Sequence, residues 1–152
     1  MSQPNISHET IIHAPIEKVW RKLVAIEDWE WNHWTKLKAK EAREGVNGKL
    51  LASYEGNEVW EEFDFTFGRV SQSEHLLSWF GSVGPNGCLF SGHHTMKLEA
   101  VTENQTKLLH QERFAGILPM IGLGLPYKTL DRNYLLMNES LKQTVEQEEA
   151  NY

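Results

Sequence analysis

The feature that most constrains the fold is one amphipathic helix near the end of the chain, placed after a long run of strand-like segments. Its apolar residues recur at steps of three or four and predict a helix of about five turns: Tyr127, Leu130, Tyr134, Met137, Leu141 and Val145. Six segments before it read as strands separated by turn signals, over residues 34–43, 48–55, 58–72, 75–83, 88–101 and 106–117. A helix with a single apolar stripe must bury that stripe, and the sheet is the surface available.

The first part of the chain predicts one strand and two short helical segments. Alternation from Ile6 to about His13 is typical of a strand, and Pro15 is a favourable first residue of a helix. The run "EDWEWNHW" then predicts a second short helix or turn. Helices that are segregated from consecutive strands indicate an α+β fold with an antiparallel sheet. We expect a curved sheet of about six to seven strands wrapped around the long C-terminal helix, with a hollow between them.

Composition excludes several classes of protein. The chain of 152 residues shows no repeat and no linker, so we expect one domain over residues 1–152. A formal net charge of −6 argues against nucleic acid as a partner. No apolar run approaches the ~20 residues of a membrane span or forms a signal peptide, so we expect no stable membrane insertion. The single cysteine, Cys88, indicates a reduced thiol and a cytoplasmic protein.

The order and spacing of these segments resemble the SRPBCC superfamily of START-like, helix-grip proteins, which includes the major birch pollen allergen and polyketide cyclase-like proteins. The resemblance covers about Ile6 to Glu148 and is carried by "IHAPIEKVWRKLVAIEDW", "WNHW", "LSWFGS", "LFSGHHTMKLEAV", "TKLLHQERFAGIL" and "LLMNESLKQTVEQ". It implies a cavity between sheet and C-terminal helix that holds a small hydrophobic molecule, lipid-, sterol- or polyketide-like. It does not imply one activity, because carriers, cyclases and chaperone activators share this frame. The run "DWEWNHW" departs from many relatives and predicts an aromatic wall or a narrowed cavity mouth.

One histidine lies on the apolar face of a predicted strand. In "FSGHHTMKLEA", His94 shares a face with Phe90, Met96 and Leu98, whereas Lys97 marks the opposite face as the wet one. The next strand places His110 and Glu112 on the face that Leu108 and Phe114 also occupy. If Leu98 pairs with Leu108, then Met96 faces His110 and His94 faces Glu112. The sequence thus predicts a histidine and a carboxylate side by side in an apolar interior.

This pair admits three interpretations. It is a structural pair, because a buried charge is costly without a partner. It is a polar anchor for a ligand, which is the usual arrangement in an apolar pocket. Or His94 and Glu112 are catalytic residues that act as acid and base. A metal site built from His94, His110 and Glu112 is disfavoured, since no ligand motif is present, and we expect no metal and no cofactor.

The full set of residues that we expect at the ligand is Trp79, Phe90, His94, Met96, His110, Glu112, Phe114, Tyr134 and Asn138. For Trp79 a core position is as well supported as a place in the cavity wall. For Asn138 a hydrogen bond to the protein is favoured over contact with ligand. Phe63, Phe65 and Phe67 are expected in the core.

Three functions remain open from the sequence: a carrier or sensor without chemistry, a polyketide cyclase-like enzyme, and a protein-interaction module of the chaperone-activator type. The third predicts a large exposed apolar patch, which the segment Ile117–Leu125 could supply, and a filled interior. An open cavity favours the first two. Glycines in the segment Ala115–Pro126 lower the cost of bending, so we expect this segment to move when ligand enters.

Overall fold

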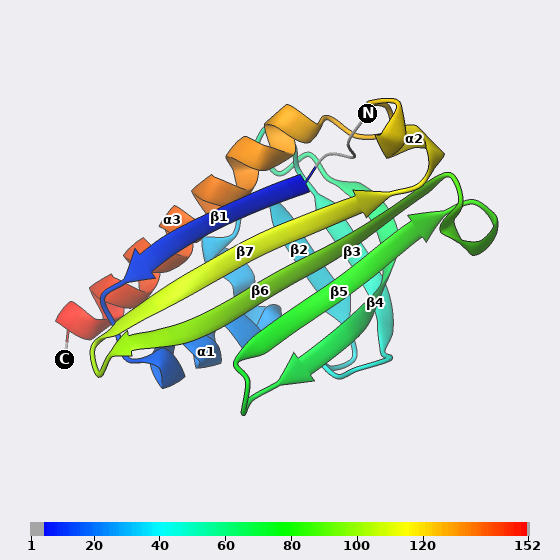
Figure 1. Ribbon diagram of the computed structural model, residues 1–152. Coiled ribbons are helices and arrows are strands. Elements are labelled where there is room, and N and C mark those ends of the chain that lie inside the picture. The colour runs from blue at the N-terminus through cyan, green and yellow to red at the C-terminus, as the bar shows by residue number, and fades with distance from the viewer. Residues whose placement is uncertain (1–4, 152) are drawn as a thin grey trace.

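The computed structural model describes residues 5–151, in which seven strands form one antiparallel sheet in the order β1-β7-β6-β5-β4-β3-β2 (Figure 1). The strands are β1 (Asn5–Ile12), β2 (Thr35–Ala39), β3 (Asn47–Ala52), β4 (Glu61–Ser71), β5 (Leu76–Val83), β6 (Phe90–Thr102) and β7 (Gln105–Ala115). The chain therefore runs across the sheet from β2 to β7 by successive neighbours. β1 closes the far edge against β7, which brings the N-terminal strand beside the last one.

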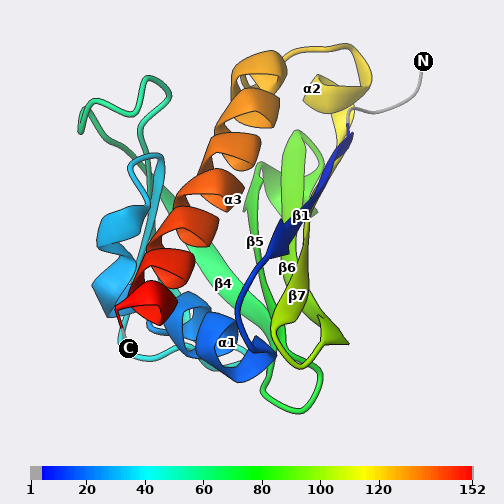
Figure 2. The same cartoon turned by 90° about the vertical axis from the view of Figure 1, so that its left-hand side faces the viewer.

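The helical segments are α1 (Ile16–Val24), the 3-10 segment η1 (Ile26–Trp31), the one-turn η2 (Pro85–Gly87), α2 (Ile117–Met120) and the long α3 (Tyr127–Ala150). Of these, α1, η1 and α3 lie on one face of the sheet, whereas η2 lies in the turn between β5 and β6 and α2 follows the end of β7 (Figure 1). Figure 2 shows α3 lying across that face, with α1 near its C-terminal end and α2 near its N-terminal end. The buried side of α3 is the apolar stripe predicted from the sequence, with Asn133 and Asn138 added to it. The curved sheet wrapped around a long C-terminal helix is thus confirmed.

The register of β6 against β7 is the one predicted from alternation. Leu98 pairs with Leu108, Met96 with His110, and His94 with Glu112. The alternation succeeded because the buried apolar residues of each strand lie on one face, and a slip by one residue would turn them to solvent. The expected hinge-like segment at residues 115–126 instead contains one helical turn, α2, whose backbone hydrogen bonds to Cys88 and Leu89 tie it to the loop before β6.

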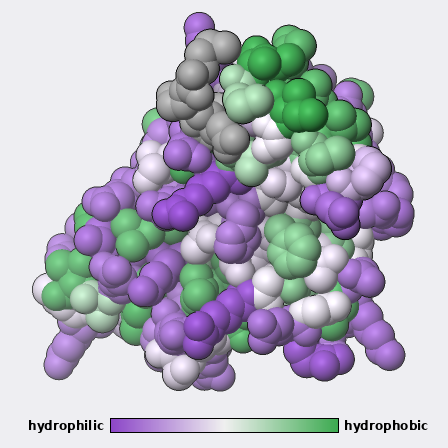
Figure 3. Space-filling model, turned by 45° about the vertical axis from the view of Figure 1, so that its right-hand side comes forward, coloured by the Kyte–Doolittle hydropathy of each residue, from purple (hydrophilic) through white to green (hydrophobic). Residues whose placement is uncertain are grey.

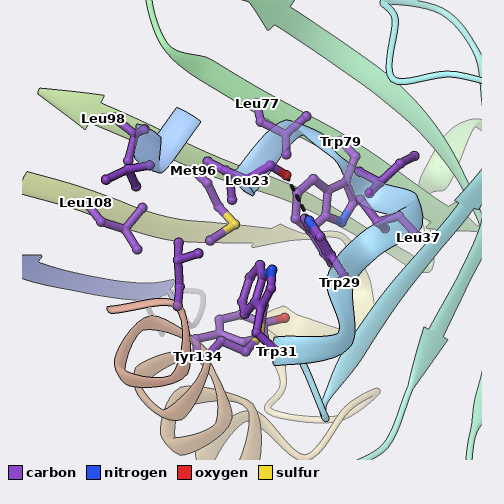
Figure 4. Packing of buried hydrophobic residues seen from close by; sticks show 14 of the residues in the cluster. Leu23, Trp29, Trp31, Leu37, Leu77, Trp79, Met96, Leu98, Leu108 and Tyr134 are labelled. Carbon is purple, nitrogen blue, oxygen red and sulfur yellow. Dashed lines mark hydrogen bonds between the residues drawn. The ribbon is translucent and has the colours of Figure 1, made fainter. Parts of the chain in front are cut away.

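The tryptophans of the "DWEWNHW" run divide between core and cavity. Trp29 is 1% exposed, lies against Trp79 in the core, and donates its Nε1–H to the Leu23 carbonyl at 2.8 Å (Figure 4). Trp31 is also buried, beneath α3. Of the three tryptophans in this run, Trp34 alone lines the cavity described below. Most of the run therefore anchors η1 to the core and does not form an aromatic wall.

The longest described helix, α3, is amphipathic rather than apolar throughout. Within residues 5–151, no helix combines the length and the apolar character needed to cross a membrane.

Candidate functional site

A cavity of about 510 Å³ lies between the sheet and the N-terminal half of α3. Its wall comes from β2 to β7, from the loop after β3, from the segment after α2, and from α3. Most of the wall is apolar, and seven aromatic side chains contribute to it: Trp34, Tyr54, Phe63, Phe65, Trp79, Phe90 and Tyr134. A hollow of this size and character is typical of a small-molecule site.

Five of the nine residues predicted at the ligand line this cavity: Trp79, Phe90, His94, Glu112 and Tyr134. The other four lie behind the wall and are fully or nearly fully buried: Met96, His110, Phe114 and Asn138. Trp79 was expected either in the core or in the cavity wall, and it occupies both: the residue is 2% exposed and its side chain lines the cavity. Of the phenylalanines expected in the core, Phe65 and Phe67 are buried, whereas Phe63 is 36% exposed and lines the cavity.

A series of polar contacts, most of them hydrogen bonds, connects the cavity to the interior. At the cavity end, the Tyr134 hydroxyl donates to Oε1 of Glu112, which also lies 3.4 Å from Nδ1 of His94. Nε2 of His94 is 2.5 Å from Nε2 of His110. The series then passes from Nδ1 of His110 to Oδ1 of Asn138 at 2.7 Å.

The hydrogen bond between His110 and Asn138, at the interior end of this series of contacts, sets the tautomers of both histidines. Asn138 donates its amide N–H to the Thr10 hydroxyl at 3.1 Å, so its Oδ1 must accept from Nδ1–H of His110. With Nδ1 protonated, neutral His110 has Nε2 as an acceptor, and His94 must donate through Nε2–H.

Ring stacking holds both imidazoles in place. The His94 ring lies on Trp79 with a centroid distance of 4.1 Å and an interplanar angle of 15°. The His110 ring stacks on Tyr134 at 4.8 Å and 16°.

Burial shifts the titration of this cluster. Desolvation, with a smaller contribution from the charge of His94, holds the pKa of His110 well below its usual value. Desolvation and the neighbouring Glu112 carboxylate raise the pKa of Tyr134 well above its usual value. At the cavity wall, burial together with Glu61 and Glu112 raises the pKa of Tyr54 to about 12. Both phenols therefore remain protonated donors at neutral pH.

The position of the Glu112 carboxylate depends on a glycine in the next strand. A Cβ at Gly92 would lie 2.6 Å from Oε2 of Glu112, so only glycine allows the carboxylate to rest there. Gly92 itself lines the cavity. Oε1 of Glu112 is bonded to Tyr134, whereas Oε2 makes no hydrogen bond to any residue within 5–151.

The geometry of the two histidines does not suit a metal ion. Their Nε2 atoms face each other within hydrogen-bond distance, which leaves no volume for a cation between them. In the part of the chain that the structure describes, no three histidine, cysteine or carboxylate side chains are grouped as ligands.

Many of the residues that line the cavity were not anticipated from the sequence, among them Tyr54, Gly92 and Asn133. Asn133 is 2% exposed and donates its amide N–H to the Tyr54 carbonyl, which couples α3 to the loop after β3. The signal that could have revealed Asn133 is its place beside Tyr134 on the apolar stripe. Tyr54 follows a strand and carried no pattern that separates it from an ordinary loop residue.

The comparisons with known proteins support the fold alone. No protein-family model matches the chain, and no curated protein matches its sequence. Among solved structures, the Zhui aromatase/cyclase from a Streptomyces species superposes with a TM-score of 0.72 at 12% identity, covering 96% of this chain and 95% of that one. Ara h 8.0201 gives 0.67 at 14% identity, covering 96% and 99%. Norcoclaurine synthase from Thalictrum flavum gives 0.62 at 12% identity, covering 95% and 87%.

These likenesses extend over nearly the whole chain and agree with the sheet order and the long C-terminal helix described above. The protein has the helix-grip fold of SRPBCC, polyketide cyclase-like proteins. Proteins with different activities share this fold, so the fold by itself does not define an activity.

Proposed function

We propose that this protein binds a small hydrophobic molecule in the cavity between sheet and α3, as a carrier or sensor. The observation that carries the proposal is the cavity itself, of about 510 Å³, with seven aromatic side chains in a wall whose surface is mostly apolar. A closed core would have filled this volume, since protein interiors are packed to the density of organic crystals.

Native mass spectrometry of the gently purified protein, followed by solvent extraction, tests the proposal. A released small molecule that is absent from an Ala52→Phe variant would support it, because Ala52 lines the cavity and a phenyl ring there would occupy the space. Ala100→Phe is the matched control, because Ala100 is exposed on β6. Equal ligand content in Ala52→Phe and wild type would contradict the proposal.

A second candidate function is acid–base catalysis in the manner of a cyclase. It is favoured by one contact: His94 and Glu112 lie 3.4 Å apart at the cavity wall, and Tyr134 bonds the same carboxylate. A base within reach of a bound substrate is the first requirement of such chemistry. Under this reading Glu112→Gln abolishes turnover of a captured ligand while its binding survives, and unchanged turnover would remove the acid–base role.

A protein-interaction role draws on a different surface. Four apolar side chains around α2 are exposed: Ile117, Met120, Ile121 and Leu123. Figure 3 shows hydrophobic side chains gathered at the top of that view. The open cavity favours ligand binding over this reading, because an interaction module has no need of a hollow interior. Pull-down with wild type and an Ile121→Ser variant would test the patch, and identical captured proteins would exclude it.

We also propose that the segment from Ala115 to Pro126 opens when ligand enters. Leu118, Gly124 and Leu125 from this segment line the cavity, so the segment forms part of its wall. Alanine at Gly122 or Gly124 would not test this cleanly, because both have positive φ and alanine would strain the backbone. Amide hydrogen exchange, measured with and without ligand, tests the proposal directly. Bound ligand should slow the exchange of the α2 amides, and unchanged exchange would contradict the proposal.

A further inference from the structure

The polar groups at the cavity wall are divided unequally between committed donors and free acceptors. The Thr35 hydroxyl donates to Sδ of Met137, and the Ser53 hydroxyl donates to Asn57. The Tyr134 hydroxyl donates to Glu112, and its proton is therefore also committed. These three donors are already used by the protein, and the Tyr54 hydroxyl at the same wall is bonded to Glu61. The exposed Ser82 hydroxyl is a further donor in the lining.

The acceptors are different. Oε2 of Glu112 makes no hydrogen bond to residues 5–151, although its carboxylate is only 12% exposed. Oδ1 of Asn133, a residue that is 2% exposed at the same wall, is also without a hydrogen-bond partner in the described chain. Oδ1 of Asn133 is a buried acceptor without a partner, whereas Oε2 of Glu112 is an unpaired acceptor on a residue that lines the cavity. A bound molecule that supplies a donor to either oxygen gains more than one that does not.

The charges at the wall disfavour an anion. Its lining contains the acidic residues Glu62, Asp64 and Glu112, and, within the described residues, neither lysine nor arginine. Lys49 forms ion pairs with Glu62 and Asp64. Glu112 is therefore the carboxylate that makes the electrostatic potential inside the cavity negative. Its effect reaches across the cavity, since it contributes to the raised pKa of Tyr54. His94, the one group there that can carry positive charge, already faces Glu112.

We propose that the cavity takes an aromatic molecule whose innermost group is an uncharged or cationic O–H or N–H donor to Oε2 of Glu112, and that it rejects carboxylates and phosphates. This inference rests on the proposed function and adds the chemical class of ligand to it. The aromatic wall suits a flat ring system, and faces of tryptophan and tyrosine also attract a cation. Gly92 is the residue that permits this specificity, because any side chain there would displace Oε2.

Four probes that share a naphthalene ring test the proposal by calorimetric titration: naphthalenemethanol, its methyl ether, naphthylmethylamine and naphthoate. The alcohol and the ether have nearly the same shape and differ in the donor. We expect the alcohol and the amine each to bind about tenfold or more tightly than the ether, and naphthoate to bind more weakly still. The relative affinities of the alcohol and the amine show whether the cavity prefers an uncharged hydroxyl donor or a protonated amine.

Glu112→Gln gives the decisive comparison. Its amide oxygen would keep the bond from Tyr134, so the amide N–H₂ would take the place of Oε2 and turn an acceptor into a donor. The preference should then invert toward the ether and naphthoate. Glu99→Gln is the control, because Glu99 pairs with Lys107 away from the cavity. If Glu112→Gln does not fold, Gly92→Ala provides the second test and should abolish the preference.

The outcomes separate the two proposals. Equal affinity for alcohol and ether, or tightest binding of naphthoate, overturns the ligand class while leaving the binding function intact. A donor preference that persists unchanged in both Glu112→Gln and Gly92→Ala overturns the role of Glu112. Failure of all four probes to bind overturns the cavity as a small-molecule site, and the ligand class with it.

Discussion

Acid should destabilise this protein through one buried histidine, His110. Its ring is 0% exposed and hydrogen-bonded on both sides, by His94 and Asn138, in its neutral form. Burial and the neighbouring His94 hold its pKa well below the 6.5 of an unfolded chain. As the pH falls, the unfolded state therefore binds a proton at this ring that the folded state does not bind. The free energy of unfolding falls as the pH drops through 6.5 toward the folded pKa.

The magnitude follows from protonation of the unfolded chain. With an unfolded pKa of 6.5 and a ring that stays neutral in the folded state, one such group loses about 2 kcal/mol of unfolding free energy between about pH 7 and pH 5. The loss per pH unit approaches, and does not exceed, about 1.4 kcal/mol. This is a large part of the about 5–15 kcal/mol that stabilises a typical domain.

Urea unfolding, extrapolated to water at several pH values, measures the effect. The relevant quantity is the difference between wild type and His110→Gln, because the other histidines are common to both. His93→Gln is the matched control, since His93 is exposed one position away from His94 on the same strand. Wild type should lose about 2 kcal/mol more than His110→Gln over this range. An equal loss in both proteins would refute the assignment of His110 as a buried neutral histidine.

Three further predictions concern stability at neutral pH and are read from urea unfolding. Tyr134→Phe removes the hydroxyl that donates to Glu112 and should cost about 2 kcal/mol; an unchanged midpoint would mean that this bond is not formed in solution. Trp79→Ala should cost about 3 kcal/mol, at the low end for a buried tryptophan because the ring also borders a cavity; a loss below about 1 kcal/mol would contradict its burial. Gly56→Ala should cost about 2 kcal/mol, because φ is +67° and the new Cβ would lie 2.6 Å from Nε1 of Trp34; a neutral effect would contradict this close approach.

Alternation in two adjacent strands was enough to predict that His94 and Glu112 lie opposite each other in the site. His94 and Glu112 were placed opposite each other because Leu98 and Leu108, further along the same faces, set the register. The periodicity of the last helix likewise predicted which side of α3 is buried, including Tyr134. These are short-range patterns with a physical period, so the sequence alone carries them.

The contacts that connect separate elements could not be predicted in the same way. The bond from Tyr134 to Glu112 joins α3 to β7, and the bond from Asn138 to Thr10 joins α3 to β1. Each depends on the rotation and height of α3 above the sheet, which no local period encodes. The same holds for Asn133, whose contact with Tyr54 depends on the path of a loop after β3.

The sequence by itself determined the elements, their order and the inward face of each, because burial of apolar side chains fixes the phase of a strand or a helix. The tertiary structure alone decided which inward residues reach the cavity and which lie behind it. His94 and His110 illustrate the difference: both point inward, yet one lines the cavity and the other is sealed beneath α3. The reason is that the alternation of a strand specifies a direction, whereas a cavity depends on how closely two separate elements approach.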